Sequence, residues 1–307
     1  MIVFNSIEEV NLGPGITTIL GNFDGVHKGH QQLIKEARNH GAKTLVITFE
    51  PHPMVFKGVR VKKIQSIEEK LAVLEQNGVD GVLIIPFTKE FASMDKEDFV
   101  REILVEQLQS STVIVGYNYH FGKGGLGKSS DIPELGRKYG FSGIVVPAYK
   151  EDHRPISSSL IRNLITSGKI REVNRLLGHR YQVEGLVVHG EGVGRTIGFP
   201  TANLEIAGDK LLPKAGVYSI IGKIRGSEFQ GFCNVGFQPT FKDRRKKMVV
   251  EANFFDFDED IYGERIVVIF VDYLRPVRKF SSVESLVREL LLDKDQARKS
   301  IMEKVEI

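Results

Sequence analysis

Two histidines three residues apart are the first side chains in this sequence whose types and spacing could do chemistry. His27 and His30 end the segment GNFDGVHKGH, residues 21–30, which leaves a predicted strand at 17–20 and enters a predicted helix. A spacing of three puts both imidazoles on one side of the first helical turn. The helix dipole and the unpaired amides there favour an anion, and each imidazole can donate to a non-bridging phosphate oxygen. The segment therefore predicts a polyphosphate site.

Two other interpretations of the histidine pair stay open from the residues alone. His30 could be a polar helix cap and His27 a solvated loop residue, with no ligand at either. Zinc is the other chemical option, but no third His or Cys ligand stands at a plausible spacing. Glycines at 21, 25 and 29 favour ligand binding, because they let the main chain approach a ligand closely.

A carboxylate on a predicted strand is the candidate base of a second group. Glu251 alternates with the apolar residues 250 and 252, so it shares one strand face with Asn253. A Glu on a strand is often only solvated, and the residues around Glu251 do not by themselves decide between the two roles. Its interpretation therefore depends on the groups that the fold brings near it.

A glycine-rich segment upstream could supply those groups. Residues 190–198 hold four glycines and Arg195, which predicts a mobile flap whose amides wrap phosphates. Thr201 and Asn203 follow and would share one face if extended, and their oxygens suit Mg²⁺, which usually shares its ligands with substrate phosphates. The plain alternative is a hairpin rich in turn residues.

The elements that must position these groups follow two patterns. Up to about Gly178, apolar strands alternate with helices, which indicates βαβ units, a parallel sheet and ligands at the carboxyl ends of the strands. These strands are predicted at Thr17–Leu20, Thr44–Phe49, Val82–Pro86, Thr112–Val115 and Gly143–Val146. Later strands follow one another without helices and are predicted at Tyr181–Val188, Val217–Ile224, Phe229–Val235, Val249–Phe257 and Ile266–Tyr273. We predict an α/β domain over residues 1–180 and an all-β barrel or sandwich with a terminal helix over 181–307.

Three helix starts are readable from capping residues. They are Ser66 with Glu69 as a capping box, Asp95 as the N-cap of a helical run over 99–108, and Ser281 with Glu284 for the terminal helix from about residue 282.

Composition excludes several classes of protein. The 41% apolar and 26% charged residues are those of a globular chain, and 42 basic against 39 acidic residues give no general attraction to nucleic acid or anionic lipid. The single cysteine, Cys233, excludes an internal disulfide framework. The start of the chain lacks the pattern of a secretory signal, and no apolar run approaches the ~20 residues of a membrane span. We therefore expect a soluble, cytoplasmic protein.

The histidine segment and three later motifs resemble a known family. His-x-Gly-His after a strand is the signature of the HxGH nucleotidylyltransferases, and residues 21–30 are close to the form seen in bacterial FAD synthetases. FEPHP at 49–53, GYNYHFG at 116–122 and ISSSLIR at 156–162 resemble further motifs of that family in order, with Ser159 where Thr is usual. The resemblance implies phosphate or ATP contacts at Gly21, Asn22, Phe23, Gly25, Gly29, Ser158, Ser159 and Arg162, catalytic roles for His27 and His30, and flavin contacts at His52 and Asn118.

The second half resembles the riboflavin kinases, whose domain is a small six-stranded barrel. GFPTANL at 198–204, NVGFQPT at 234–240 and Glu251 follow that family's order, while Asn253 stands where a His is frequent. The resemblance implies Mg²⁺ at Thr201 with Asn203, general-base catalysis by Glu251, ATP contacts at Gly194, Arg195 and Gly198, and flavin contacts at Asn234, Pro239 and Thr240.

Together the two resemblances imply a bacterial bifunctional riboflavin kinase/FMN adenylyltransferase. Such an enzyme would convert riboflavin to FMN and FMN to FAD with ATP and Mg²⁺, and we expect no nucleic-acid, membrane or obligate protein partner. A monofunctional variant and a catalytically silent flavin- or RNA-binding module are the alternatives.

Two further patterns suggest other functions. GKGGLGKS at 122–129 matches the phosphate-binding motif of P-loop NTPases letter for letter, but its strand should end by Gly116 and its helix should start only near Asp131. The basic run at 242–247 could bind nucleic acid, although we expect a solvated turn between two strands.

Overall fold

The computed structural model describes residues 1–56, 58–190, 192–240 and 243–303, with side chains for all of these except 193, 238–240 and 243–247. The contacts within the chain divide it into two compact units, Met1–Ser157 and Ser158–Ile307. Each unit has its own sheet and its own apolar core, and each is described by itself.

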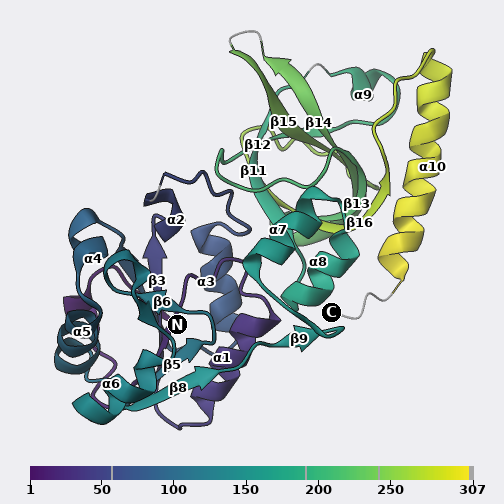
Figure 1. The fold of residues 1–307 in the computed structure, drawn as a ribbon. Helices are drawn as coiled ribbons and strands as arrows, with labels where there is room; N and C mark the ends of the chain where they lie inside the picture. The colour runs from purple at the N-terminus through teal and green to yellow at the C-terminus, as the bar shows by residue number, and fades with distance from the viewer. Residues whose placement is uncertain (57, 191, 241–242, 304–307) are drawn as a thin grey trace. The chain divides into compact units, whose positions relative to one another are not determined.

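A parallel sheet of six strands is the centre of the first unit (Figure 1). In spatial order its strands are β1 (Ile2–Phe4), β4 (Gly81–Pro86), β3 (Thr44–Glu50), β2 (Thr17–Leu20), β5 (Thr112–Gly116) and β8 (Ser142–Val146). The chain runs from β2 to β3 and β4 on one side and then crosses to β5 and β8 on the other. In open α/β sheets, ligands bind outside the carboxyl ends of the strands at such a switch point. We therefore expect a ligand to bind near the segments that follow β2 and β5.

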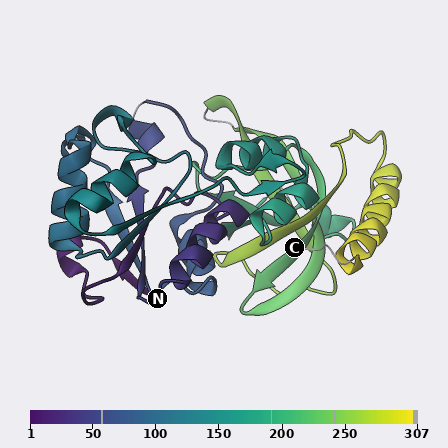
Figure 2. The same cartoon turned by 60° about the horizontal axis from the view of Figure 1, so that its bottom comes forward.

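Helices cover both faces of this sheet. Leu33 and Ile34 of α1 (Lys28–Arg38) and Leu74 of α3 (Ile67–Gln76) pack on one face. On the other face lie Phe99 of the π-type helix Phe99–Gln107 and Ile132 of α6 (Asp131–Tyr139). Figure 2 shows the strands running between these two sets of helices. The shorter elements are η1 (Ile7–Glu9), α2 (Pro53–Phe56), α4 (Lys89–Ser93), α5 (Lys96–Asp98), β6 (His120–Phe121), η3 (Lys123–Gly125), β7 (Gly127–Lys128), β9 (Lys150–Glu151) and β10 (Arg154–Pro155).

The strands and caps predicted for this unit form within one residue of their expected bounds. Ser66 and Glu69 make the reciprocal capping box, and Asp95 caps α5 through its side chain. The sequence gives no signal for β1, because Ile2 and Val3 lie at the sheet edge, both exposed, in too short a run for periodicity. Consequently Thr17–Leu20 is the second strand of the chain and not the first.

The segment with the P-loop spelling folds as a small hairpin. β6 pairs antiparallel with β7 around η3, and α6 begins only at Asp131. The mechanism of a P-loop needs a strand, a phosphate-wrapping loop and a helix starting at the Lys. Lys128 instead lies in β7. The P-loop interpretation is therefore wrong.

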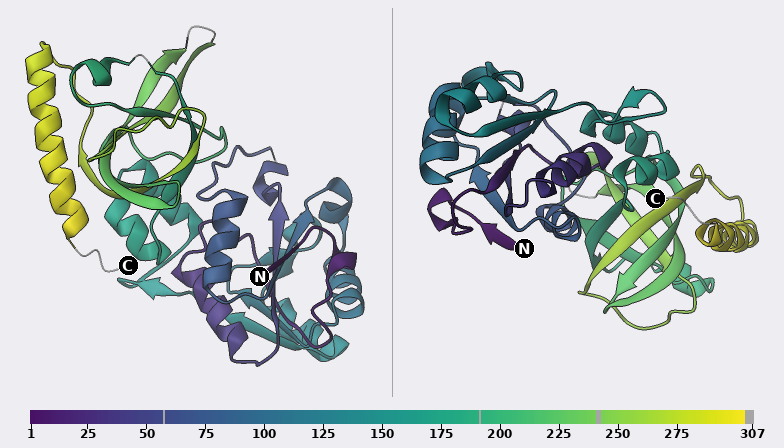
Figure 3. Two further views of the ribbon diagram at one scale, coloured as in Figure 1. Left: turned by 180° about the vertical axis from the view of Figure 1, so that it is seen from behind. Right: turned by 90° about the horizontal axis from the view of Figure 1, so that it is seen from below.

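Six antiparallel strands close into a barrel in the second unit (Figure 3). In order around the barrel they are β11 (Gln182–Val188), β12 (Ala202–Ile206), β15 (Asp243–Phe254), β14 (Ser227–Thr240), β13 (Gly216–Ile224) and β16 (Arg265–Arg275), and β16 pairs back to β11. Closure leaves no free edge for pairing with another chain. The predicted barrel is confirmed, and β15 reaches back to Asp243, so the basic run is mostly strand and not a turn. Residues 241 and 242 lie outside the described residues.

Two short helices precede the barrel, α7 (Ser158–Thr166) and α8 (Ile170–Leu177), and α9 (Val193–Thr196) interrupts the segment between β11 and β12. The buried Asn174 of α8 donates to the carbonyl of Phe270 at 3.0 Å and accepts from the amide of Tyr181 at 2.7 Å. These bonds tie α8 to β16 and to the segment that begins β11. The compact units therefore divide at 157/158, whereas the functional boundary that we propose remains at 180/181.

The terminal helix α10 (Val283–Met302) lies along the barrel (Figure 1) and is held there by a buried ion pair. Arg275 at the end of β16 makes two bonds to the carboxylate of Asp293, at 2.7 and 2.6 Å, and the Asp293 side chain is only 2% exposed. The N-cap lies one residue later than predicted, because Ser282 pairs reciprocally with Ser285 and Ser281 does not pair with Glu284. An anchored helix of this kind makes the barrel and α10 one folding unit.

Removing one partner of this ion pair should destabilise the second unit strongly. Asp293→Ala removes two charge-assisted bonds from the buried Arg275 guanidinium and leaves it only the Glu289 carboxylate, at 3.2 Å. We therefore expect a loss of about 3 kcal/mol in the free energy of unfolding, the lower end of the range for a broken buried pair. Urea unfolding followed by circular dichroism measures the change. Arg278→Met is the matched control, because Arg278 is 54% exposed in its pair with Glu289 and should cost no more than about 1 kcal/mol. A small loss in Asp293→Ala would contradict this account of α10.

Candidate active sites

The two predicted imidazoles meet at the start of α1, directly beyond the carboxyl end of β2. The rings of His27 and His30 are stacked, with their centroids 3.7 Å apart and their planes 15° apart. His27 is the N-cap of α1, and its Nδ1 accepts the backbone N–H of His30 at 3.3 Å. A neutral His27 therefore carries its proton on Nε2, as a donor. Both rings stand at the positive end of a helix dipole.

The segment before the pair is held in an irregular shape by buried contacts. Asp24, 4% exposed, accepts the backbone N–H groups of Ile64 and Gln65 at 3.0 and 3.4 Å. Gly29 has no side chain in the space of the His27 ring, since a Cβ there would lie 3.0 Å from Nδ1. The loop is therefore fixed before any ligand arrives.

His30 is buried in a way that disfavours its charged form. Burial is the main cause that lowers its pKa well below 6.5, and the nearby His27 and Lys70 add to the effect. Its Nδ1 is buried and has no hydrogen-bond partner among the described residues. A neutral imidazole with an unsatisfied nitrogen can make a new hydrogen bond to a ligand at low cost.

Sequence analysis did not single out the lysine beneath this loop. Lys70 of α3 is 7% exposed and donates to the backbone carbonyl of Asn22 at 2.9 Å and to the hydroxyl of Thr48 at 3.2 Å. Thr48 itself donates to the same carbonyl at 3.0 Å. One pattern in the sequence could have indicated that Lys70 is buried. Residue 70 falls on the same face of α3 as the apolar Ile67 and Leu74, so its charge lies among core positions.

The other predicted residues of the first half are placed as follows. Phe23 is fully buried in the core, so only its main chain could meet a ligand. His52 is half-buried and its Nδ1 accepts the amide of Met54, while Asn118 is exposed in the turn after β5. Ser158 starts α7 in the second compact unit, with Ser159 and Arg162 on the same helix.

In the barrel, three polar side chains stand in one row across neighbouring strands. Asn203 of β12 is directly opposite Glu251 of β15, and Glu251 is directly opposite Asn234 of β14. The Asn234 amide lies 3.5 Å from the Glu251 carboxylate. Residues one position along, Ala252 and Cys233, are fully buried, so the polar row occupies the outer face of the barrel. This row brings together three of the residues predicted for the kinase.

The turn that leads into β12 is held by the residue that departs from the kinase pattern. Asn253, 6% exposed, donates to the carbonyl of Pro200 at 2.7 Å. Gly194 lies against this turn, because a Cβ there would come within 2.3 Å of the Phe199 carbonyl and 3.4 Å of the Thr201 hydroxyl. Thr201 is thus fixed between the glycine-rich segment and the polar row.

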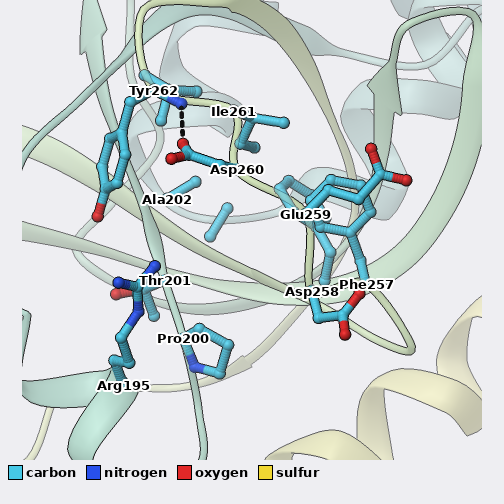
Figure 4. Close-up of a pocket in the computed structure, with 13 residues that line it drawn as sticks. Arg195, Pro200, Thr201, Ala202, Phe257, Asp258, Glu259, Asp260, Ile261 and Tyr262 are labelled. Carbon is cyan, nitrogen blue, oxygen red and sulfur yellow. Dashed lines mark hydrogen bonds between the residues drawn. The ribbon is translucent and has the colours of Figure 1, made fainter.

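A cavity of about 250 Å³ opens on the other side of Thr201 (Figure 4). Its size suits part of a nucleotide better than a whole one. Arg195, Pro200 and Thr201 lie across it from Phe257 and the acidic residues that follow. Ala202 and Ala252 also line the cavity.

The far wall of this cavity is supported from outside. Tyr262 stacks on His189 with the ring centroids 3.9 Å apart. Arg225 binds the carboxylates of Glu259 and Glu264 and donates to the carbonyl of Asp260 at 3.0 Å. The sequence did not predict the two supports of this wall, Arg225 and His189, because they become its neighbours only when the barrel closes. Of the other predicted kinase residues, Gly198 lies after α9, and the side chains of Pro239 and Thr240 are outside the described residues.

Comparison with known proteins agrees with both halves. Residues 12–160 match the family model for FAD synthetase, and residues 177–301 match the model for riboflavin kinase. A bifunctional riboflavin kinase/FMN adenylyltransferase of Listeria monocytogenes is 38% identical over 91% of this chain and 90% of its own. The chain belongs to this bifunctional family. The enzyme of the same name from Escherichia coli is 31% identical and covers 97% of both chains.

The similarity extends to the complete fold. A solved structure of a macrolide-efflux protein from Streptococcus pneumoniae has a TM-score of 0.88 to this chain, with 30% identity, and covers 97% of this chain and 98% of its own. That name applies to that protein, and a shared fold does not transfer an activity. Within the described part of this chain, no helix has the length and apolar character to cross a membrane.

The described residues also bear on metal binding by this family member. They include no cluster of three or more His, Cys, Asp or Glu side chains that could hold a metal, which gives no support to the zinc alternative. The Thr201 hydroxyl and the Asn203 amide oxygen are hard ligands, and they fit a Mg²⁺ ion that takes its remaining ligands from substrate phosphates and water.

The buried His30 should make stability depend on pH. Because its pKa in the folded chain lies below the ordinary 6.5, the unfolded chain binds more protons between these two values. Stability that is present above about pH 6.5 is therefore lost as the pH falls towards the folded pKa. We expect the Tm of the first unit to fall more steeply between about pH 7 and 5 in the native chain than in His30→Asn, measured by differential scanning calorimetry. Parallel slopes would contradict the burial of a neutral His30.

Proposed function

We propose that the adenylyltransferase reaction of this family takes place at the histidine pair. The phosphate of FMN attacks the α-phosphorus of ATP, a new P–O–P bond forms, the bond to the β-phosphate breaks, and pyrophosphate leaves. FMN phosphate is already an anion, so this step needs no general base. The supporting observation is the stacked pair His27 and His30 at the start of α1, with His30 Nδ1 unsatisfied.

At this site the imidazoles stabilise the charge that develops on the transferred and leaving phosphates. The main chain from Gly21 to Gly29 surrounds the phosphates, and we assign further phosphate contacts to Ser158, Ser159 and Arg162. His52 and Asn118 are assigned to the flavin side. Ser158, Ser159 and Arg162 follow from the resemblance, and our functional boundary at 180/181 rests on the same assignment.

We propose that riboflavin is phosphorylated at the polar row of the barrel. The 5′-hydroxyl of riboflavin attacks the γ-phosphorus of ATP, its proton passes to the Glu251 carboxylate, and ADP leaves. The supporting observation is that Asn203, Glu251 and Asn234 stand opposite one another while Thr201 borders the cavity on the other side. Part of ATP then occupies the cavity that Arg195 lines. We assign further ATP contacts to Gly194 and Gly198 and flavin contacts to Asn234, Pro239 and Thr240, as the resemblance to the riboflavin kinases implies.

Mg²⁺ belongs to this proposal through Thr201 and Asn203. When bound, the ion would offset the negative charge of the phosphates. A cytoplasmic location, and the absence of nucleic-acid, membrane and obligate protein partners, also remain predictions. They rest on the balanced charge and on Cys233, which is the only cysteine and is buried.

Loss of an imidazole should affect only the second reaction. We expect His30→Ala or His27→Ala to reduce FAD formation from FMN by ~10²-fold or more, as loss of one transition-state donor does, with FMN formation from riboflavin unchanged. Purified protein with ATP and Mg²⁺, assayed by chromatography for FMN and FAD, measures both rates. Lys128→Ala is the control for the rejected P-loop and should change neither. Loss of both activities in a folded variant would contradict two separate sites.

Neutralising the candidate base should have the opposite effect. Glu251→Gln keeps the size of the side chain but cannot accept the proton, so FMN formation should fall ~10²–10⁴-fold. FAD formation from added FMN should stay at the native rate in the same preparation. Glu205→Gln, at an exposed position of β12, is the matched control and should leave both rates unchanged. Native kinase activity in Glu251→Gln would remove Glu251 from the proposed mechanism.

A further inference from the structure

A buried lysine beneath the histidine loop has no role in the mechanism given above. Lys70 is enclosed between α3 and the loop that follows β2, and its ammonium group has two hydrogen-bond acceptors, the carbonyl of Asn22 and the hydroxyl of Thr48. An ammonium has three protons to donate. No carboxylate lies within 4.0 Å of it among the described residues.

The nearest acidic groups are committed to other partners. Asp24 accepts two backbone amides, and Glu50 pairs with Lys63 at 2.6 Å. Their charges favour the ammonium form of Lys70, but burial outweighs them, and the pKa of Lys70 is lowered. Burying a charge without a close counter-ion is costly, so stability alone would favour an apolar side chain here. A function that uses the charge explains why the cost is tolerated.

The charge of Lys70 also acts on the predicted catalytic pair. Together with His27, it is one of the two neighbouring groups that oppose protonation of His30. Through Asn22 it also fixes the main chain between β2 and His27. The other charged groups around these residues are Asp24 and Glu50 with Lys63, and the pair Lys28–Glu151 at 3.7 Å at the start of α1.

We infer that Lys70 is a positioning residue for adenylyl transfer, which acts through the Asn22 carbonyl and through a fixed positive charge beneath His30. The anion that completes this charge is the polyphosphate of a nucleoside triphosphate, or the pyrophosphate that leaves. Before the anion arrives, Lys70 adds to the burial and to the His27 contribution that disfavour the charged form of His30. When the anion is bound, Lys70 and the imidazoles face negative charge together. This inference rests on the site proposed at His27 and His30.

The test compares a neutral and a charged substitution in the full-length chain. Lys70→Met should lower kcat for FAD formation about tenfold, less than loss of a direct donor, with little change in KM for FMN. Lys70→Arg, which keeps the charge, should recover at least half of the loss on a logarithmic scale. Lys35→Met, an exposed lysine of α1, should stay within about twofold of the native rate. The Tm of the first unit, measured by differential scanning calorimetry, shows whether each variant is folded there, and FMN formation in the same samples reports on the barrel.

A second readout separates positioning from packing. We expect the imidazole of His30, followed by NMR and assigned with His30→Asn, to titrate at higher pH in Lys70→Met than in the native chain. Equal losses in Lys70→Met and Lys70→Arg with an unmoved His30 titration would overturn the inference. Should Lys70→Met not fold, Lys70→Gln takes its place.

The two proposals fail in different ways. Native FAD formation in Lys70→Met, with strong loss in His30→Asn, would remove Lys70 and keep the histidine site. Native FAD formation in both variants would remove the site itself.

Discussion

A cluster of hydrogen-bond donors at the carboxyl end of β2 is the constraint on which the first unit depends. A helix start, two imidazoles and a buried ammonium converge there, and among the described residues no carboxylate within 4.0 Å neutralises Lys70. We propose that a polyphosphate is the anion that these donors bind. The buried contacts that fix the loop serve this function, because hydrogen-bond donors speed a reaction most when they do not have to reorganise. Asp24, Thr48 and Gly29 hold the main chain of the loop between β2 and α1 in place.

The barrel solves a different problem, since there a neutral hydroxyl must lose a proton. Antiparallel pairing sets Asn203, Glu251 and Asn234 side by side without long flexible segments. Closing the barrel supplies the rigidity, and α10 with its Arg275–Asp293 pair braces the outside.

Much of this arrangement was predictable from local sequence patterns. Five of the six strands of the first sheet and the caps at Ser66 and Asp95 follow from apolar patterns and from side chains that bond within one turn. The proximity of the two histidines was predictable because residues three apart lie on the same side of a helical turn. Lys70, Arg225 and the Tyr262–His189 stack were not predictable, because their partners lie 22 or more residues away in the chain and become neighbours only when it folds. The start of α10 was missed by one residue because two serines were equally able to cap it.

The parity of β15 has a consequence for how chains of this kind can change in length. Glu251 faces outward and Ala252 faces inward. One residue gained or lost within β15 before Glu251 would turn the carboxylate into the apolar interior and expose the alanine. Insertions between the end of β14 and the start of β15 leave that alternation untouched. Changes in length can therefore accumulate at the junction between β14 and β15. Around Glu251 the strand tolerates only substitutions.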